Sequence, residues 1–462
     1  MLKPFYKYLK DLRVIFLAIT CTTITHSTQA QSVTDNIFDG KTLKGWKIVG
    51  GKAPFQVDNG IIVGTMTKGT PNTFLVSEKQ YGDFILELEV KLEGDETNSG
   101  IQIRSHIDST SKSNRQIIYG KQVEIDPTSR AWTGGIYDES RRMWLYPVDL
   151  NENAKTAFKP NAYNKIKIEA IGNSTKTWIN GIPVAQLIDT IDQSGHIALQ
   201  VHSVQDKYDG MKVFFKNLKL QTKNLETSPF PKESYIVNLA TNKLSTDEIN
   251  NGYKLLFNGQ DASGWRSARG SEFPTKGWKI QNGILSVEKS DGGESTNGGD
   301  IITIEKYKAF DFSFEFKLTE GANSGVKYFV TLKEQTSGSA IGLEYQILDD
   351  KVHPDAKQGR AGNRTLASLY DLITAKKSNR AIKKIGEWNK GRIVVTPDNK
   401  VTHYLNGEIV LEYVRGSEEF KNLVEMSKYK NWEGFGMAES GHILLQDHGD
   451  NVSFRNLKIR EL

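Results

Sequence analysis

The sequence has little cysteine, little net charge and no long apolar run. Cys21 is the one cysteine among 462 residues, so a chain without its first 30 residues has no disulfide, thiolate metal site or catalytic thiol. The net charge is only +5, and residues 1–30 carry +3 of it. The remaining charge of about +2 is too small to attract the phosphates of a nucleic acid, so a dedicated nucleic-acid-binding protein is not expected. Because no further apolar run approaches the length of a bilayer-spanning helix, we expect no membrane span.

The first 30 residues are typical of an export signal. Residues 1–13 are basic, residues 14–25 form a short apolar segment, and Thr28-Gln29-Ala30 offers small residues for cleavage. We therefore expect a mature chain that starts at Gln31 and is periplasmic or secreted. Lipidation of Cys21 is the alternative, although Thr20 fits the lipoprotein cleavage site poorly.

The rest of the chain is an internal duplication. The segment that begins Phe38-Asp39-Gly40 recurs 219 residues later, and Asn98-Ser99-Gly100 recurs as Asn323-Ser324-Gly325. Each copy is about 200 residues long, which is the size of a whole domain rather than of a solenoid repeat. We predict domain 1 at residues 31–222, a linker at 223–244 and domain 2 at 245–462. Ser245 to Glu248 fits a capping box that opens a short helix.

Both copies show the periodicity of β-strands. Residues 85–91 alternate apolar and polar side chains, and Phe310, Phe312, Phe314 and Phe316 alternate with polar residues. The pairs Asn180-Gly181 and Asn406-Gly407 are typical of hairpin turns. Many short strands joined by Gly-rich turns predict an all-β protein of two jelly-roll β-sandwich domains in tandem, each with one concave face.

Several strands carry polar side chains on a whole face. Each copy has one strand with a Gln/Glu pair at period two and a later strand with Gln two residues before His; these are Gln122 with Glu124, Gln200 with His202, Glu344 with Gln346, and Gln446 with His448. Lys, Ser and Thr usually dominate a merely solvated face, so the pattern favours a polar groove for a sugar or a hard metal ion. A solvated outer face is the alternative.

Other polar residues extend this pattern. Strict alternation places Arg104 on the same face as Gln102, with Lys327 as the cationic residue of the second copy. We interpret the two Asn-Ser-Gly segments as turns that serve backbone geometry. Glu89 and Glu315 either face the groove or pair with lysines.

A conventional glycosidase is one alternative. Glu124-Ile125-Asp126 resembles the start of the acidic motif of laminarinase-like jelly-roll glycosidases. Retaining hydrolysis needs two carboxylates about 5 Å apart. Thr128 and Ser129 occupy the positions where the second carboxylate would be needed, and Gln346 replaces Glu124 in the second copy. The residues therefore do not favour two-carboxylate hydrolysis.

The ordered motifs resemble those of a known family. Those that carry the resemblance are the segments 38–46, 72–75, 81–84, 98–104, 122–126 and 132–139 in the first copy, and 255–259, 323–329, 344–349 and 368–372 in the second. Together they resemble the bacterial 3-keto-disaccharide hydrolase family, also described as 3-keto-glucoside 1,2-lyase/3-keto-2-hydroxy-glucal hydratase domains. The resemblance covers nearly all of both copies.

The resemblance implies concanavalin-like jelly rolls and an exported enzyme. It implies cleavage of 3-keto-glycosides or oligosaccharides by elimination and hydration, with a separate glycoside 3-dehydrogenase supplying the ketone and a divalent metal cation assisting in at least some members. A non-catalytic tandem glycan-binding module is the alternative from another class, because the same sandwich commonly serves that role.

The resemblance and the polar faces together assign candidate roles. The catalytic candidates are Glu124, His202, Glu344 and His448. The substrate-binding candidates are Arg104, Gln122, Tyr137, Gln200, Lys327, Gln346, Tyr370 and Gln446. The metal-ligand candidates are Glu124, Asp138, His202, Asp371 and His448.

Overall fold

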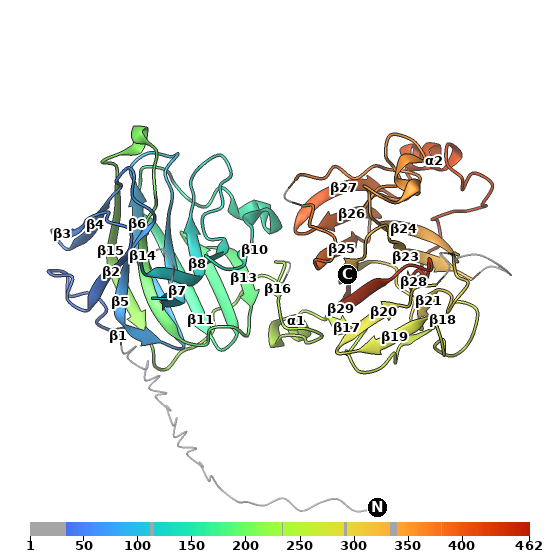
Figure 1. Cartoon of the computed structure of the whole chain (residues 1–462), viewed down its shortest axis with the longest axis horizontal. Coiled ribbons are helices and arrows are strands. Elements are labelled where there is room, and N and C mark those ends of the chain that lie inside the picture. The colour runs from blue at the N-terminus through green and yellow to red at the C-terminus, as the bar shows by residue number, and fades with distance from the viewer. Residues whose placement is uncertain (1–33, 111–114, 233, 291–292, 333–339, 380) are drawn as a thin grey trace, which may run out of the picture.

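Two β-sandwich domains lie side by side in the computed structural model (Figure 1). It describes residues 34–110, 115–232, 234–290, 293–332, 340–379 and 381–462. The predicted export signal at residues 1–30, with Cys21, lies outside the described residues. Within the described ranges, no helix is long and apolar enough to cross a membrane. The predicted all-β fold with two tandem sandwiches is confirmed.

Domain 1 is formed by two sheets. In spatial order, the first contains β16 (Val237–Asn238), β13 (Ile182–Ile188), β12 (Ser174–Ile179), β11 (Asn164–Ile171), β6 (Phe84–Leu92), β15 (Lys212–Gln221), β4 (Ile61–Thr65) and β3 (Phe55–Asp58), with β1 (Thr34–Asp35) beside β15. The second contains β10 (Met143–Tyr146), β9 (Ile136–Glu139), β8 (Ile117–Ile125), β7 (Ser99–Asp108), β14 (Gly195–Val201), β5 (Thr73–Tyr81) and β2 (Trp46–Gly50).

Domain 2 repeats this arrangement. Its first sheet contains β19 (Trp278–Gln281), β20 (Ile284–Val287), β29 (Val452–Glu461), β22 (Phe310–Leu318), β25 (Asn389–Val395), β26 (Lys400–Leu405) and β27 (Glu408–Val414), with β17 (Lys254–Leu255) beside β29. Its second sheet contains β18 (Trp265–Ser267), β21 (Ile301–Thr303), β28 (His442–Leu445), β23 (Asn323–Thr331) and β24 (Ile341–Leu348). The helices are α1 (Thr246–Asn250) and α2 (Glu418–Glu425), with 3₁₀ turns at Val148–Leu150, Glu152–Ala154, Asp206–Tyr208 and Pro354–Lys357.

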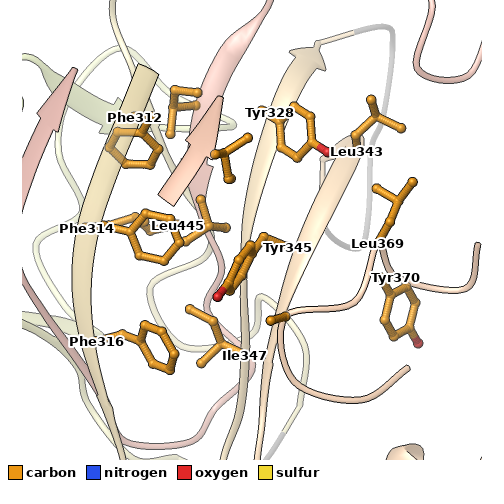
Figure 2. Close-up of a cluster of buried hydrophobic side chains, with 14 of the residues drawn as sticks. Phe312, Phe314, Phe316, Tyr328, Leu343, Tyr345, Ile347, Leu369, Tyr370 and Leu445 are labelled. Atoms are coloured by element: carbon orange, nitrogen blue, oxygen red, sulfur yellow. The ribbon is translucent and has the colours of Figure 1, made fainter. Parts of the chain in front are cut away.

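The alternating phenylalanines of β22 build the core of domain 2. Phe312, Phe314 and Phe316 follow one another along the strand, and Tyr345 and Ile347 of β24 face them across the sandwich (Figure 2). All five side chains are buried. Fully burying one such side chain contributes about 1.5–3 kcal/mol, so this ladder is a main source of the domain's stability. The period-two prediction for this strand is confirmed.

Because successive residues of a strand point to opposite faces, the inward position of Tyr345 also fixes the direction of its neighbours. Glu344 and Gln346 therefore point away from the phenylalanine ladder. Tyr370 lies beyond β24, on the side away from that ladder (Figure 2). In domain 1, Val123 and Ile125 are buried in the core in the same way, which turns Gln122 and Glu124 outward.

The segment between the domains packs against both of them. Its short strand β16 pairs in parallel with β13 of domain 1. The Tyr235 carbonyl accepts a 3.1 Å hydrogen bond from the Tyr146 hydroxyl, and the Tyr235 ring lies 4.3 Å from the guanidinium of Arg392 in domain 2. The predicted capping box is confirmed, since the Ser245 side chain and the Glu248 side chain exchange hydrogen bonds with each other's backbone at the start of α1.

Glu89 and Glu315 form ion pairs on the first sheets of the two domains. Glu89 lies 3.4 Å from Lys216, and Glu315 accepts a 2.7 Å hydrogen bond from Arg455. Of the two alternatives, pairing with basic residues is therefore the one observed.

Candidate functional site

Each domain has a polar pocket on its second sheet, and the two pockets lie at corresponding positions. The cavity measures about 240 Å³ in domain 1 and about 260 Å³ in domain 2. The domain 1 pocket is lined by Asn72, Asn98, Gln122, Glu124, Arg130, Tyr137, Glu139, Trp144, Gln200 and His202. The domain 2 pocket is lined by Glu294, Asn323, Lys327, Ile341, Glu344, Gln346, Tyr370, Lys428, Tyr429, Trp432, Gln446 and His448.

Glu124 lies at the floor of the domain 1 pocket and is almost fully buried, at 5 % exposure. Its carboxylate accepts a 2.5 Å hydrogen bond from the Asn98 amide and a 2.9 Å bond from the Gln122 amide. Burial is the main reason that the pKa of Glu124 is raised to about 7; the nearby charge of Asp126 acts in the same direction, and the two hydrogen bonds and Arg130 act against it. A carboxyl group with a pKa near neutrality is suited to proton transfer at physiological pH.

His202 enters the same pocket from the end of β14. Its Nδ1 donates a 2.6 Å hydrogen bond to the Ser203 carbonyl, because a carbonyl oxygen can only accept. Burial lowers the pKa of His202. The ring is therefore neutral near pH 7, with Nε2 as an acceptor.

Unpartnered amide atoms point to a ligand in both pockets. Among the described residues, Asn98 Oδ1 and Gln200 Nε2 in domain 1 are buried without a hydrogen-bond partner. In domain 2 the same holds for Asn323 Oδ1 and Gln446 Oε1. A buried polar atom without a partner costs about 1–3 kcal/mol. Hydroxyl groups of a bound sugar would satisfy these atoms.

In the domain 2 pocket, the acidic side chain lies two residues earlier along the strand than in the domain 1 pocket. Glu344 of β24 occupies the position of Gln122, and Gln346 occupies that of Glu124. Burial raises the pKa of Glu344, and Lys327 is the largest opposing influence. Lys327 of β23 is the cross-strand neighbour of Glu344, and its Nζ lies 3.7 Å from the carboxylate.

Aromatic and basic side chains form the wall of the domain 2 pocket. The Lys428 Nζ lies 4.4 Å from the centre of the Tyr370 ring, and the Tyr370 hydroxyl donates a 2.8 Å hydrogen bond to Asp355. Trp432 is 42 % exposed at the pocket. His448 lies beside His353, with ring centres 6.2 Å apart.

The structure does not bring Arg104 to the pocket. A β-bulge interrupts the pairing of β7 with β8 between Gln102 and His106, and Arg104 adopts a left-handed backbone conformation with φ of 48°. The bulge breaks the alternation on which the prediction relied. The Arg104 guanidinium instead donates to the carbonyls of Gly82, Ala170 and Gly172 and to the Asp83 carboxylate.

Asp138 and Asp371 also point away from the pockets. Asp138 pairs in register with Lys121, on the face opposite to Gln122, and its carboxylate is held by Arg141 and Arg142. Asp371 accepts hydrogen bonds from the Arg364 side chain and from the backbone of Lys428. Of the five proposed metal ligands, Glu124 and His202 thus share one pocket, and His448 lies in the other.

Comparison with known proteins identifies the family. Residues 34–221 and 252–460 each match the model of the 3-keto-alpha-glucoside-1,2-lyase-like domain. The chain belongs to this family. It is also 38 % identical over 232 residues to a protein named 3-keto-disaccharide hydrolase from Bacteroides thetaiotaomicron, across 46 % of this chain and 79 % of that protein. Both copies are therefore domains of the 3-keto-alpha-glucoside-1,2-lyase-like family.

Several solved structures are similar to part of this chain. Two crystal structures of proteins from Parabacteroides distasonis, described as candidate glycosyl hydrolases, are 29 % and 26 % identical to this chain. They cover 48 % and 46 % of it, and 99 % of their own length, with TM-scores of 0.42 and 0.35. A carbohydrate-binding module from Bacillus subtilis is 17 % identical, covers 38 % of this chain and 95 % of its own, and has a TM-score of 0.26.

Both pockets of this 3-keto-alpha-glucoside-1,2-lyase-like protein contain residues that the sequence patterns did not predict. Asn98 lies directly before β7, and Asn323 is the first residue of β23, so the Asn-Ser-Gly segments lead into strands rather than forming turns. A role in backbone geometry alone would not require asparagine at this position in both copies. The recurrence of Asn98 as Asn323 was therefore the sequence signal that these side chains belong to the pockets. The other missed lining residues come from loops and strand ends without a repeated pattern; among them are Asn72, Arg130, Trp144, Glu294, Lys428, Tyr429 and Trp432.

The glycine of each Asn-Ser-Gly segment makes room for the pocket floor. A Cβ on Gly100 would lie 2.2 Å from the Gln122 side chain, so alanine would displace Gln122 from Glu124. We expect Gly100→Ala to lower the free energy of unfolding by about 1–3 kcal/mol and to reduce turnover by the domain 1 pocket. Gly82→Ala is the control, because its nearest neighbour would be 3.7 Å away. Urea unfolding and an activity assay of both variants would test this, and equal behaviour would contradict it.

Proposed function

We propose that this protein cleaves 3-keto-glycosides by elimination and hydration, with net hydrolysis of the glycosidic bond. The observation that carries the proposal is Glu124, a buried carboxyl group whose pKa is raised to about 7 at the floor of a polar pocket. The family match and the name of the relative from Bacteroides thetaiotaomicron supply the substrate class.

The chemistry follows from the ketone. A carbonyl at carbon 3 acidifies the proton on carbon 2, and a carboxylate can remove that proton as a general base. The electron pair passes through an enolate and expels the aglycone oxygen from carbon 1, which then takes up a proton. Addition of water across the new carbon 1–carbon 2 double bond completes net hydrolysis.

The residues of the domain 1 pocket match these steps. Glu124 is the proposed base. Gln200 Nε2, which lacks a partner among the described residues, is the proposed donor to the enolate oxygen. The neutral His202 accepts a substrate hydroxyl at Nε2, and Tyr137 packs beside the sugar. In domain 2, Glu344 and His448 are the corresponding candidates, with Gln346, Tyr370 and Gln446 as binding residues.

The side chains present do not fit a resident metal ion. The described residues contain no group of three or more His, Cys, Asp and Glu side chains placed to hold one. Both oxygens of Glu124 already accept amide hydrogen bonds, and Asp138 and Asp371 are held by arginines. We therefore route no step through a metal, and metal assistance stays a prediction to be tested with a chelator.

The direct test is an assay of the full chain on a 3-keto-glucoside and on the matching unoxidised glucoside, each with and without EDTA. We expect cleavage of the keto form only, because only the ketone acidifies carbon 2. Loss of activity with EDTA would support the predicted metal, and unchanged activity would contradict it. Cleavage of the unoxidised glucoside would favour conventional hydrolysis instead. Binding of both sugars without cleavage would favour a glycan-binding module.

The proposal includes the setting of the reaction. The substrate carries a ketone that this chemistry does not create, so a separate glycoside 3-dehydrogenase must act before this protein. The basic and apolar pattern of residues 1–30 supports export, which would place the reaction in the periplasm or outside the cell.

A further inference from the structure

The elimination proposed for the domain 1 pocket requires a second proton-transfer group. Glu124 takes the proton from carbon 2, but the aglycone oxygen must also take up a proton as it leaves carbon 1. An alkoxide leaves slowly unless an acid protonates it during the departure. We therefore looked for a proton donor beside the pocket.

A second carboxyl group lines the same pocket. Glu139 is the last residue of β9, two positions after Tyr137, so both side chains lie on the face of the sheet that carries the pocket. Burial raises the pKa of Tyr137, and the charges of Glu139 and Glu124 act in the same direction. The two carboxyl groups therefore both lie near the Tyr137 hydroxyl.

Glu139 lies where the pocket meets a flanking cavity. This flanking cavity measures about 220 Å³ and shares Asn72 and Glu139 with the pocket. Phe74 and Ile118, which belong to a small apolar cluster, also line it. With the 3-keto sugar in the pocket and the aglycone in the flanking cavity, the glycosidic oxygen would lie at the junction, beside the Glu139 carboxyl group.

A third cavity adjoins the pocket but offers no protonated carboxyl group. It measures about 360 Å³ and shares Asn98 and His202 with the pocket. The neutral His202 ring has only an acceptor, Nε2, left to offer there. Glu96 also lines this cavity, but hydrogen bonds from Tyr208 and Lys207 lower its pKa, so its carboxyl group is ionised. An aglycone in the third cavity would thus leave without a carboxylic acid beside it.

Neutral side chains hold the Glu139 carboxyl group. The side chains of Asn72 and Ser140 hydrogen-bond it. The Asn72 Oδ1 accepts a 2.9 Å hydrogen bond from the Ser203 backbone N–H, so the NH₂ group of Asn72 is left as the donor. Burial raises the pKa of Glu139, and the two hydrogen bonds act against this shift. An aglycone in the flanking cavity would exclude more water and so favour the protonated form.

We propose that Glu139 is the general acid of the domain 1 pocket and donates its proton to the aglycone oxygen at this junction. The inference rests on the proposed function, which supplies the elimination. The bond between carbon 1 and the oxygen breaks, its electron pair stays on the oxygen, and the Glu139 proton completes the alcohol. During hydration, Glu139 takes a proton from the water that adds at carbon 1, and Glu124 returns its proton to carbon 2. Both carboxyl groups regain their starting states, and one water is consumed.

The inference concerns domain 1 alone. The pair Tyr137-Asp138 recurs as Tyr370-Asp371 in the second copy, and the next residue there is Leu372 instead of a glutamate. Turnover by domain 2 would hide a loss in domain 1. The test therefore uses the full chain with Glu344→Gln, which removes the proposed base of the domain 2 pocket.

The test compares two leaving groups in this background. A 4-nitrophenolate leaves without protonation, whereas a methoxide does not. We expect Glu139→Gln to lower kcat/KM for a methyl 3-keto-glucoside by about 10²–10⁴-fold and to cause a much smaller loss for the 4-nitrophenyl 3-keto-glucoside. Glu139→Asp keeps a carboxyl group and should recover part of the activity on the methyl glycoside. Glu96→Gln, in the third cavity, is the control and should behave like its parent.

Hydrogen exchange gives a second readout. Because Glu124 is intact in Glu139→Gln, this variant should still exchange the carbon 2 proton of the methyl 3-keto-glucoside for deuterium in D₂O, as followed by proton NMR. Exchange that outpaces cleavage would show that removal of the proton persists while departure of the aglycone has become slow. Loss of exchange together with cleavage would assign Glu139 a different role and overturn the inference.

The outcomes separate this inference from the proposed function. Equal effects of Glu139→Gln on both substrates, a matching loss in Glu96→Gln, or no turnover by domain 1 in the Glu344→Gln background would each overturn the inference. The proposed function would still stand, since the natural protein cleaves the 3-keto-glucoside in all three cases. If the natural protein cleaved neither substrate, the proposed function would fail and the inference with it. Circular dichroism checks that the variants fold.

Discussion

Replacing both pocket glutamates, in the double variant Glu124→Gln and Glu344→Gln, is expected to lower kcat/KM for a 3-keto-glucoside by about 10²–10⁴-fold. Each substitution keeps the size of the side chain and removes the group that takes up the carbon 2 proton. The double variant is needed because each domain has its own pocket and one active site would mask the loss of the other.

The single variants assign the activity to the domains. A large loss in Glu344→Gln alone would place most of the turnover in domain 2, and a large loss in Glu124→Gln alone would place it in domain 1. Glu169→Gln is the matched control, because Glu169 is equally buried but pairs with Lys167 and Ser228 outside both pockets. Unchanged kcat/KM in the double variant, with circular dichroism like that of the natural protein, would rule out both carboxylates as the base.

Glu124→Gln alone is expected to change how stability depends on pH. The folded state holds the Glu124 proton up to a pKa of about 7, against an ordinary value of 4.5. Between these pH values the folded state binds more protons than the unfolded state, so its stability falls as pH rises. Because a tenfold difference in proton affinity corresponds to about 1.4 kcal/mol, the loss attributable to Glu124 is about 3 kcal/mol. Glutamine does not titrate, so the variant lacks this loss.

Urea unfolding at pH 4.5 and pH 8 measures the effect. The difference in unfolding free energy between the variant and the natural protein should move in favour of the variant by about 3 kcal/mol from the lower to the higher pH. Glu139 and Glu344, whose pKa values are also raised by burial, are present in both proteins, so their contributions cancel. A pH-independent difference would show that the Glu124 carboxyl titrates normally in the folded state.

Much of the fold followed from local patterns. The alternation in residues 310–316 predicted β22, and the burial of Phe312, Phe314 and Phe316 confirms it. Such predictions succeed because side chains of a strand alternate strictly between two faces wherever the strand is regular. The same rule placed Gln122, Glu124, Glu344 and Gln346 on polar faces, and these four side chains do line the pockets.

The predictions that failed depended on features that strand alternation does not reveal. Arg104 turns away from its pocket because a bulge in β7 inserts a left-handed residue at that position. Asp138 is held by Arg141 and Arg142, whose side chains also reach the acidic residues Asp189 and Asp192 about 50 positions further along. No period or motif in the sequence marks a bulge or names the partner of a buried charge.

The sequence by itself determined the duplication, the strand character of both copies and the polar faces, because repetition and alternation are local properties that can be read from neighbouring residues. Only the tertiary structure decided which polar side chains share a pocket and what surrounds them. It buried Glu124 and so raised its pKa, and it set Lys327 beside Glu344. Both results depend on desolvation and on close approach across strands, and these arise only when the sheets pack together.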